Sequence, residues 1–181
     1  ESGESNNIRM IYISNMTTLH WNEKKITDYF NHFKQVEISW SVEGYGKYND
    51  YMRHGSNWDK IIENIKEFTP HLTRFQAGIT LSSLSVLQLD KLVNWCVKNN
   101  VLYKFNNVIN PQVCRVDAIH PDIRRKLADR YEGTNLEFLC KPLRKDIPDW
   151  EERWSNFLEY TEAIDHVNKT NYKEIFPELV I

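Results

Sequence analysis

Four short apolar runs along the chain alternate with segments whose apolar residues recur every three or four positions. The runs cover residues 8–13, 36–42, 75–81 and 101–108. They are rich in Ile, Val, Phe, Tyr and Trp, and runs of this length and composition are typical of strands. The hydrophobic pattern therefore predicts four strands separated by helices.

The intervening segments follow the helical period. In 22–33 and in 58–68 the apolar residues fall on one helical face, and Ser56 is a candidate N-cap for the second helix. Ser85 and Gln88 have the spacing of a capping box before a third helix. Strands that alternate with helices favour a parallel sheet with right-handed crossovers.

The pattern after the fourth strand is helical to the end of the chain. Pro121 suits the first turn of a helix, and a last helix is expected to begin near Asp149. The basic stretch 124–126 is expected to be the solvated face of its helix. We therefore expect one α/β domain over 1–181. Residues 1–117 would form about four parallel βα units of a partial (βα) barrel, and residues 118–181 a C-terminal helical extension.

Composition and charge exclude several classes of protein. The 181 residues are 41% hydrophobic and 13% aromatic, which is enough for a core and unlike a disordered chain. No apolar run is long enough to cross a membrane. The net charge of −2 gives no footprint for duplex nucleic acid. We expect neither a membrane nor duplex nucleic acid as a partner.

The three cysteines form no recognisable ligand set. Cys96, Cys114 and Cys140 are widely spaced, and no CxxC pattern occurs. The histidines form no HxxxH or HExxH pair, so we expect no metal site in this chain. The absence of a disulfide framework favours the cytoplasm.

Small polar residues follow the predicted strands, where parallel βα folds place their ligand sites. The candidates are Asn15, Ser41, Glu43, Thr80 and Asn107. Such hydroxyl, amide and carboxylate groups suit the hydroxyls and amides of a sugar or nucleoside. Asn15 and Asn107 could instead cap loops.

Ser41 and Glu43 form the sharpest of these patterns. Their spacing places them on one side of an extended strand, and a carboxylate can accept hydrogen bonds from two vicinal ribose hydroxyls. In the alternative interpretation, Ser41 ends a strand and Glu43 begins a solvent-exposed turn. Arg53 follows in a loop, where it could meet a carboxylate or phosphate or form an exposed ion pair.

The segment 38–58, ISWSVEGYGKYNDYMRHGSNW, resembles the radical S-adenosylmethionine proteins of the twitch class, which carry a short TIM-type barrel. The residues that match the family's pattern there are Ser41, Gly44, Gly46, Tyr51, Arg53 and Trp58. Further similarities lie in order along the chain: Asn15 after the first strand, NNVINP at 106–111, His120-Pro121, Tyr160-Thr161, Asp165 and FPEL at 176–179.

The resemblance implies part of a (βα)6 radical enzyme barrel. In such an enzyme a reduced [4Fe–4S] cluster cleaves S-adenosylmethionine, and the deoxyadenosyl radical abstracts hydrogen from a substrate, here unidentified. Ser41 and Glu43 would hold the ribose. Asn15, Thr80 and Asn107 would contact adenosine or shape the cavity.

The chain departs from the family in its cluster region. The CxxxCxxC loop and the Gly-Gly-Glu-Pro motif are missing, and Glu43 stands where the family has Asp. The resemblance therefore points to the C-terminal part of the barrel, with N-terminal units and cluster ligands supplied from outside this sequence. The alternatives are a non-catalytic βα interaction module or remnant that binds no cluster, and another partial barrel that binds a nucleoside.

Overall fold

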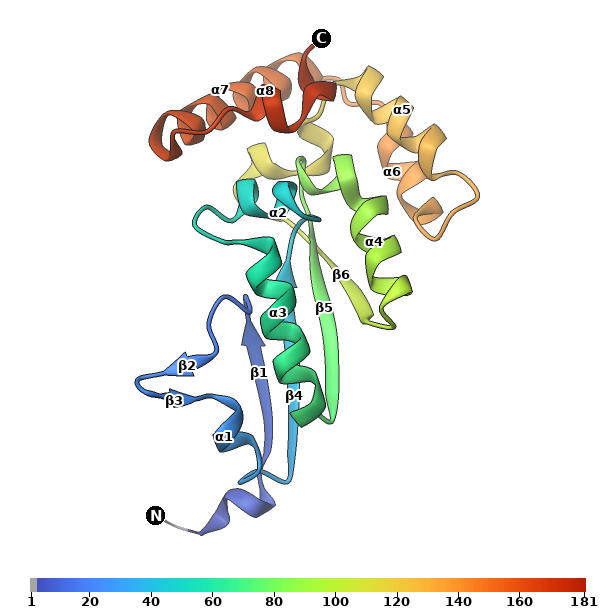
Figure 1. Cartoon of the computed structure of the whole chain (residues 1–181). Coiled ribbons are helices and arrows are strands. Elements are labelled where there is room, and N and C mark those ends of the chain that lie inside the picture. The colour runs from blue at the N-terminus through green and yellow to red at the C-terminus, as the bar shows by residue number, and fades with distance from the viewer. Residues whose placement is uncertain (1–2) are drawn as a thin grey trace.

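The computed structural model describes residues 3–181 and has a four-stranded parallel sheet at its centre (Figure 1). The strands are β1 (Arg9–Ser14), β4 (Gln35–Val42), β5 (Arg74–Leu81) and β6 (Leu102–Asn107). They lie side by side in the order β1-β4-β5-β6, and each neighbouring pair is parallel. The α/β class and the four predicted strands are confirmed.

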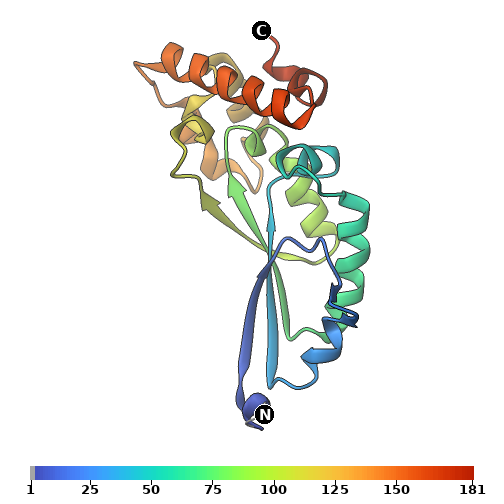
Figure 2. The ribbon, with the colours of Figure 1, turned by 90° about the vertical axis from the view of Figure 1, so that its left-hand side faces the viewer.

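The helices that connect the strands cover one face of the sheet. They are α1 (Thr27–Phe30), α3 (Trp58–Phe68) and α4 (Leu89–Lys98). Figure 2 shows them on the same side, while in the described part of the chain the opposite face has no helix layer along most of its length. Sequential strand order with all crossovers on one side is compatible with a partial βα barrel.

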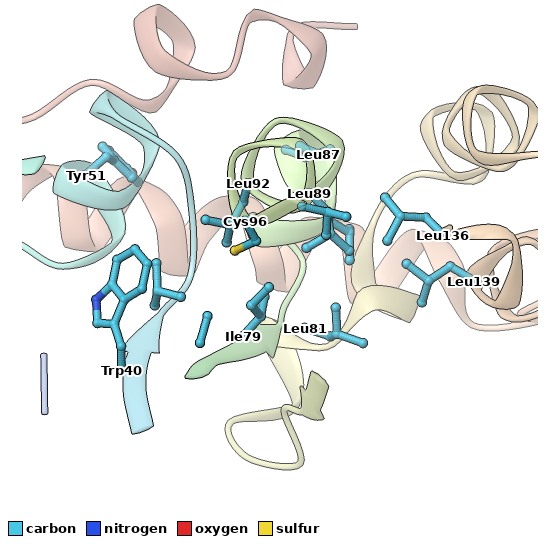
Figure 3. Packing of buried hydrophobic residues seen from close by; sticks show 14 of the residues in the cluster. Trp40, Tyr51, Ile79, Leu81, Leu87, Leu89, Leu92, Cys96, Leu136 and Leu139 are labelled. Atoms are coloured by element: carbon cyan, nitrogen blue, oxygen red, sulfur yellow. The ribbon is translucent and has the colours of Figure 1, made fainter. Parts of the chain in front are cut away.

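The core lies between the sheet and this helix layer. Along β4, Val36, Ile38, Trp40 and Val42 are buried and alternate with half-buried residues. The ring of Trp40 lies 5.7 Å from both Trp58 and Trp95. Figure 3 shows Ile79 of β5 facing Leu92 and Cys96 of α4 across the same interface. The buried residues alternate along β4 and recur every three or four positions along α3 and α4. These buried faces therefore pack together in one core.

The remaining helices lie at or beyond the carboxyl end of the sheet (Figure 1). They are α2 (Lys47–Met52), α5 (Pro121–Tyr131), α6 (Cys140–Arg144), α7 (Trp150–Asn168) and α8 (Tyr172–Ile175). Short 3-10 helices cover Glu4–Asn7, Thr69–His71, Ser85–Gln88, Gln112–Cys114, Val116–Ala118, Glu137–Leu139 and Pro177–Leu179. The helix expected near Asp149 is α7, and Pro121 begins α5 as predicted.

The helix predicted over 22–33 is wrong in its first half. A small antiparallel hairpin of β2 (His20–Trp21) and β3 (Lys24–Lys25) stands there, and α1 is a single turn. Asn22 has a φ of 54°, the left-handed conformation that a tight turn needs and a helix does not allow.

Two predicted helix caps are also wrong. Asn57, not Ser56, caps α3, since its side chain accepts a hydrogen bond of 2.9 Å from the Lys60 amide. The Ser56 hydroxyl instead donates to Asp50. Ser85 and Gln88 begin and end a 3-10 turn, and Ser85 exchanges hydrogen bonds with Ser82 instead of forming a capping box with Gln88: each hydroxyl accepts from the other residue's amide.

Arg124 does not lie on a solvated helix face. It lies in the first turn of α5, and its side chain is buried. The guanidinium donates to the carbonyl oxygens of Ile119, Leu143 and Lys145. Arg125 next to it is exposed, as the sequence predicts. Helical rotation between neighbours explains how one basic stretch contributes both a buried and an exposed guanidinium.

Candidate functional site at the carboxyl end of the sheet

A cavity of about 340 Å³ lies where β4 and β5 end, beneath α7. Its polar lining comes from five segments: the end of β4, α2, the end of β5 with the loop after it, the loop 108–114, and α7. The polar groups that matter for chemistry are Glu43, Thr80, Ser83, Cys114, Tyr160 and Asn168. We call this space the strand-end cavity.

Glu43 supplies the one carboxylate of this lining. Its Oε1 lies 3.0 Å from a guanidinium nitrogen of Arg53, and the two side chains keep 24% and 27% of their exposure respectively. Burial raises the pKa of Glu43, and the charge of Arg53 acts against that rise. The solvent-exposed turn considered for Glu43 is therefore not what the fold contains.

Gly44 allows this arrangement by letting α2 pack closely against the end of β4. A Cβ atom at Gly44 would lie 2.6 Å from Cε of Met52 and 2.9 Å from the backbone nitrogen of Asn49. Arg53 caps the carboxyl end of α2, and its amide donates to the carbonyl of Asn49. The close approach of α2 thus brings Arg53 to Glu43.

Cys114 and Tyr160 are cavity residues that the sequence did not single out as ligand-binding groups. Burial raises the pKa of the Cys114 thiol and of the Tyr160 hydroxyl. A hydrogen bond with Tyr160 lowers the pKa of Cys114 in part, while the negative charge of Glu43 raises it. The cavity therefore presents a protonated thiol and a phenol beside the carboxylate.

Asp165 of α7 accepts hydrogen bonds that hold this helix next to the cavity. One carboxylate oxygen accepts from Tyr51 at 2.9 Å and from Thr170 at 2.5 Å, and the other accepts from the Tyr172 amide at 2.6 Å. Burial and the bond to Asp165 together raise the pKa of Tyr51 well above its ordinary value. The Tyr51–Asp165 contact joins α2 to α7, so the floor and the roof of the cavity are connected.

Of the five predicted binding residues, Glu43 and Thr80 line the strand-end cavity. Ser41, Asn15 and Asn107 are not among the residues that line it. Ser41 lies between Trp40 and Val42, which are buried against the helix layer, so its side chain is on the opposite face of the sheet. Asn15 caps its own loop, since its Oδ1 accepts from the Thr17 amide and hydroxyl, as the loop-cap alternative predicts.

Asn107 lies in a neighbouring cavity of about 440 Å³ with Arg115 and Lys145. It pairs with Leu81, whose side chain faces the helix layer. Asn106 instead approaches Gly78, with Nδ2 at 3.6 Å from where a Cβ would stand. A strand turns successive side chains to opposite faces, so the two asparagines lie on opposite faces of the sheet, and of the two Asn107 is the one that lines this neighbouring cavity.

The described residues do not fit an iron–sulfur cluster. Within residues 3–181 no three His, Cys, Asp or Glu side chains are grouped to hold a metal ion. Cys96 and Cys140 are buried, and all three cysteines are free. Among the same residues, no helix combines the length and apolar character needed to cross a membrane.

Comparisons with protein-family models, with curated proteins and with solved structures find no match to this chain.

Proposed function

We propose that this chain is the C-terminal part of a radical S-adenosylmethionine enzyme and supplies the adenosine-binding side of its barrel. The observation that carries the proposal is the strand-end cavity, where Glu43 and Thr80 line one space together. A half-buried carboxylate flanked by hydroxyl and amide groups suits the vicinal hydroxyls of a ribose. The substrate of the enzyme is left open.

The residues of the family-like segment support the proposal by their places around this cavity. Gly44 admits α2 and Arg53 pairs with Glu43. Tyr51 lines the cavity and holds Asp165, another residue of the resemblance. Within residues 3–181 the sheet has two free edges and one face that has no helix layer along most of its length, as expected of barrel units that further βα units complete.

Of the two cofactors that such an enzyme uses, this chain would bind one and has no ligands for the other among its described residues. S-adenosylmethionine supplies the deoxyadenosyl radical when bound, and Glu43 and Thr80 would hold its adenosine end. The [4Fe–4S] cluster finds no ligand group among residues 3–181, so we derive no step through it. We also place the protein in the cytoplasm, a proposal that the three unpaired cysteines support.

Titration calorimetry with adenosine and 2′,3′-dideoxyadenosine tests the ribose contact directly. We expect adenosine to bind and the dideoxy analogue to bind about ten- to a hundredfold more weakly, because each charge-assisted hydrogen bond contributes roughly 1.5–3 kcal/mol. Glu43→Gln should remove most of that difference. Equal affinity of the wild-type chain for both nucleosides, or binding of neither, would contradict the proposal.

A second candidate function is a non-catalytic βα interaction module. The observation that favours it is the exposed apolar side of β1, where Ile11 and Ile13 keep 63% and 72% of their exposure. Large exposed aliphatic side chains on a strand edge are typical of interaction surfaces. Absence of nucleoside binding together with self-association through β1 would favour this second function.

A further inference from the structure

We propose that Arg53 is a positioning residue that holds the Glu43 carboxylate through one oxygen and leaves it ionised and directed into the strand-end cavity. This inference rests on the proposed ribose contact of Glu43. It adds the Arg53 guanidinium as the group that orients the Glu43 carboxylate and keeps it charged. Arg53 itself is not among the residues that line the cavity.

The geometry assigns the two carboxylate oxygens different roles. Arg53 contacts Oε1 at 3.0 Å, and among the described residues no hydrogen bond to Oε2 is found. Glu43 lines the cavity, so its second oxygen is the one available to a ligand hydroxyl. The guanidinium thus fixes the carboxylate without occupying both of its acceptor positions.

Arg53 is held by the short helix that precedes it. The Arg53 amide donates to Asn49, and the Arg53 carbonyl accepts from Ser56. Ser56 in turn donates to Asp50, which also accepts from the Trp58 amide. The Arg53 backbone is therefore anchored on both sides, and its Nε atom is buried without a hydrogen-bond partner in the described structure.

The charge of Glu43 depends on Arg53 because the other surroundings oppose ionisation. The titratable groups that share the cavity with Glu43 are Tyr51 from α2, Cys114 from the 3-10 helix and Tyr160 from α7. All three have a raised pKa and remain neutral near pH 7. Burial raises the pKa of Glu43, and among the residues that the structure describes Arg53 is the one positive charge that lowers it.

Carboxyl ¹³C NMR of the ligand-free chain tests the charge directly, with Glu43→Gln used to assign the signal. We expect Arg53→Gln to raise the Glu43 titration midpoint by about one pH unit, the lower end of the effect of a neighbouring opposite charge because the pair is partly exposed. Arg53→Lys should restore part of that shift. An unchanged midpoint in Arg53→Gln would overturn the proposal.

A measurement on the wild-type chain covers the case in which Arg53→Gln fails to fold. Salt screens a partly exposed ion pair, whereas burial is insensitive to salt. We therefore expect the Glu43 midpoint to rise between 0.01 M and 1 M salt. A midpoint that is independent of salt would overturn the proposal.

Adenosine titration separates this inference from the proposed function. In Arg53→Gln the affinity for adenosine should fall about twofold at the raised midpoint and about tenfold one pH unit below it, while the wild type, with a midpoint about one unit lower, should lose no more than about half of its affinity over the same range. A shifted midpoint in Arg53→Gln without any adenosine binding by the wild type would overturn the proposed function and support the electrostatic role of Arg53. Equal pH profiles of binding would overturn the positioning role.

Discussion

Burial separates the chemistry of the three cysteines at the scale of single residues. Cys96 is fully buried in the core, and burial raises its pKa to about 12. Cys140 is also buried and donates to the carbonyl of Ala128. Cys114 is half-buried and lines the strand-end cavity. Only the thiolate reacts with alkylating reagents, so access and pKa together decide the order of reaction.

We predict that iodoacetamide modifies Cys114 before Cys96 and Cys140 in the native chain. The reaction should be slow at pH 7 and faster as pH rises, because the pKa of Cys114 is raised and the thiolate fraction grows with pH. Peptide mass spectrometry after timed labelling measures this order, and adenosine should slow the labelling of Cys114. Cys114→Ser serves as the control. Equal labelling of all three thiols would contradict the prediction.

Sequence reasoning found the cavity residues that come from strand ends and missed those that come from elsewhere. Glu43 and Thr80 follow from the rule that parallel strands place ligand groups at their carboxyl ends. Cys114 and Tyr160 reach the cavity through a 3-10 turn and a helix roof, whose placement depends on tertiary packing. Asn107 lines the neighbouring cavity and not the strand-end cavity, because the strand-end rule does not fix which face of the sheet a terminal residue takes.

At the scale of elements, Arg124 joins α5 to the end of α6. Its guanidinium donates to Ile119 at 3.0 Å, to Leu143 at 3.3 Å and to Lys145 at 2.8 Å. All three partners are carbonyl oxygens, so no carboxylate in direct contact neutralises the charge. Burial consequently lowers the pKa of Arg124. Removal of this side chain would leave several carbonyls without a donor.

We predict that Arg124→Met lowers the free energy of unfolding by about 3 kcal/mol, since unsatisfied buried acceptors cost roughly 1–3 kcal/mol each and some will find water. Arg125→Met is the matched control, because the Arg125 side chain keeps 63% of its exposure and forms a surface ion pair with Asp122. That change should stay within about 0.5 kcal/mol. Urea unfolding followed by circular dichroism measures both. Equal effects of the two substitutions would contradict the role given to Arg124.

Element prediction succeeded where burial is periodic and failed where a turn intervenes. β4, β5 and α3 follow from apolar periodicity, since each has a clearly buried face. The edge strands β1 and β6 contain only half-buried and exposed residues, and their prediction follows from composition and run length. The segment 22–33 has helical spacing at Ile26, Tyr29, Phe30 and Phe33, and these four side chains do line one apolar cavity. They do so from one helical turn and the residues around it, so their common face does not require a long helix.

On the scale of the whole molecule, the sheet combines a complete core on one face with an exposed edge at β1. Within residues 3–181, β1 pairs only with β4 and leaves its other side open. Local periodicity predicts the strands and helices, but barrel closure depends on pairing between the first and last strands of a complete set. The sequence pattern therefore establishes βα units without establishing closure.

The open edge of β1 should make the 181-residue chain associate with itself. Unpaired backbone groups on an apolar strand are a template for pairing with another chain. Ile11 and Ile13 are exposed there, and the one charged side chain of β1, Arg9, is paired with Glu37 at 2.7 Å. Burying even about 400 Å² of this surface is worth on the order of 10 kcal/mol before the cost of association. A net charge of −2 offers little repulsion against it.

Light scattering across a concentration series measures this association. We expect the mass per particle to rise with concentration in the wild-type chain and to fall toward that of a single chain in the double variant Ile11→Lys, Ile13→Lys. The matched control is Ile109→Lys, Val167→Lys, two residues that are each 75% exposed and lie away from β1. It adds the same charge at other places, so it should leave association unchanged if β1 is responsible. Equal dispersal by both double variants would assign the effect to net charge, and a wild-type chain that stays single at every concentration would mean that the β1 edge resists pairing.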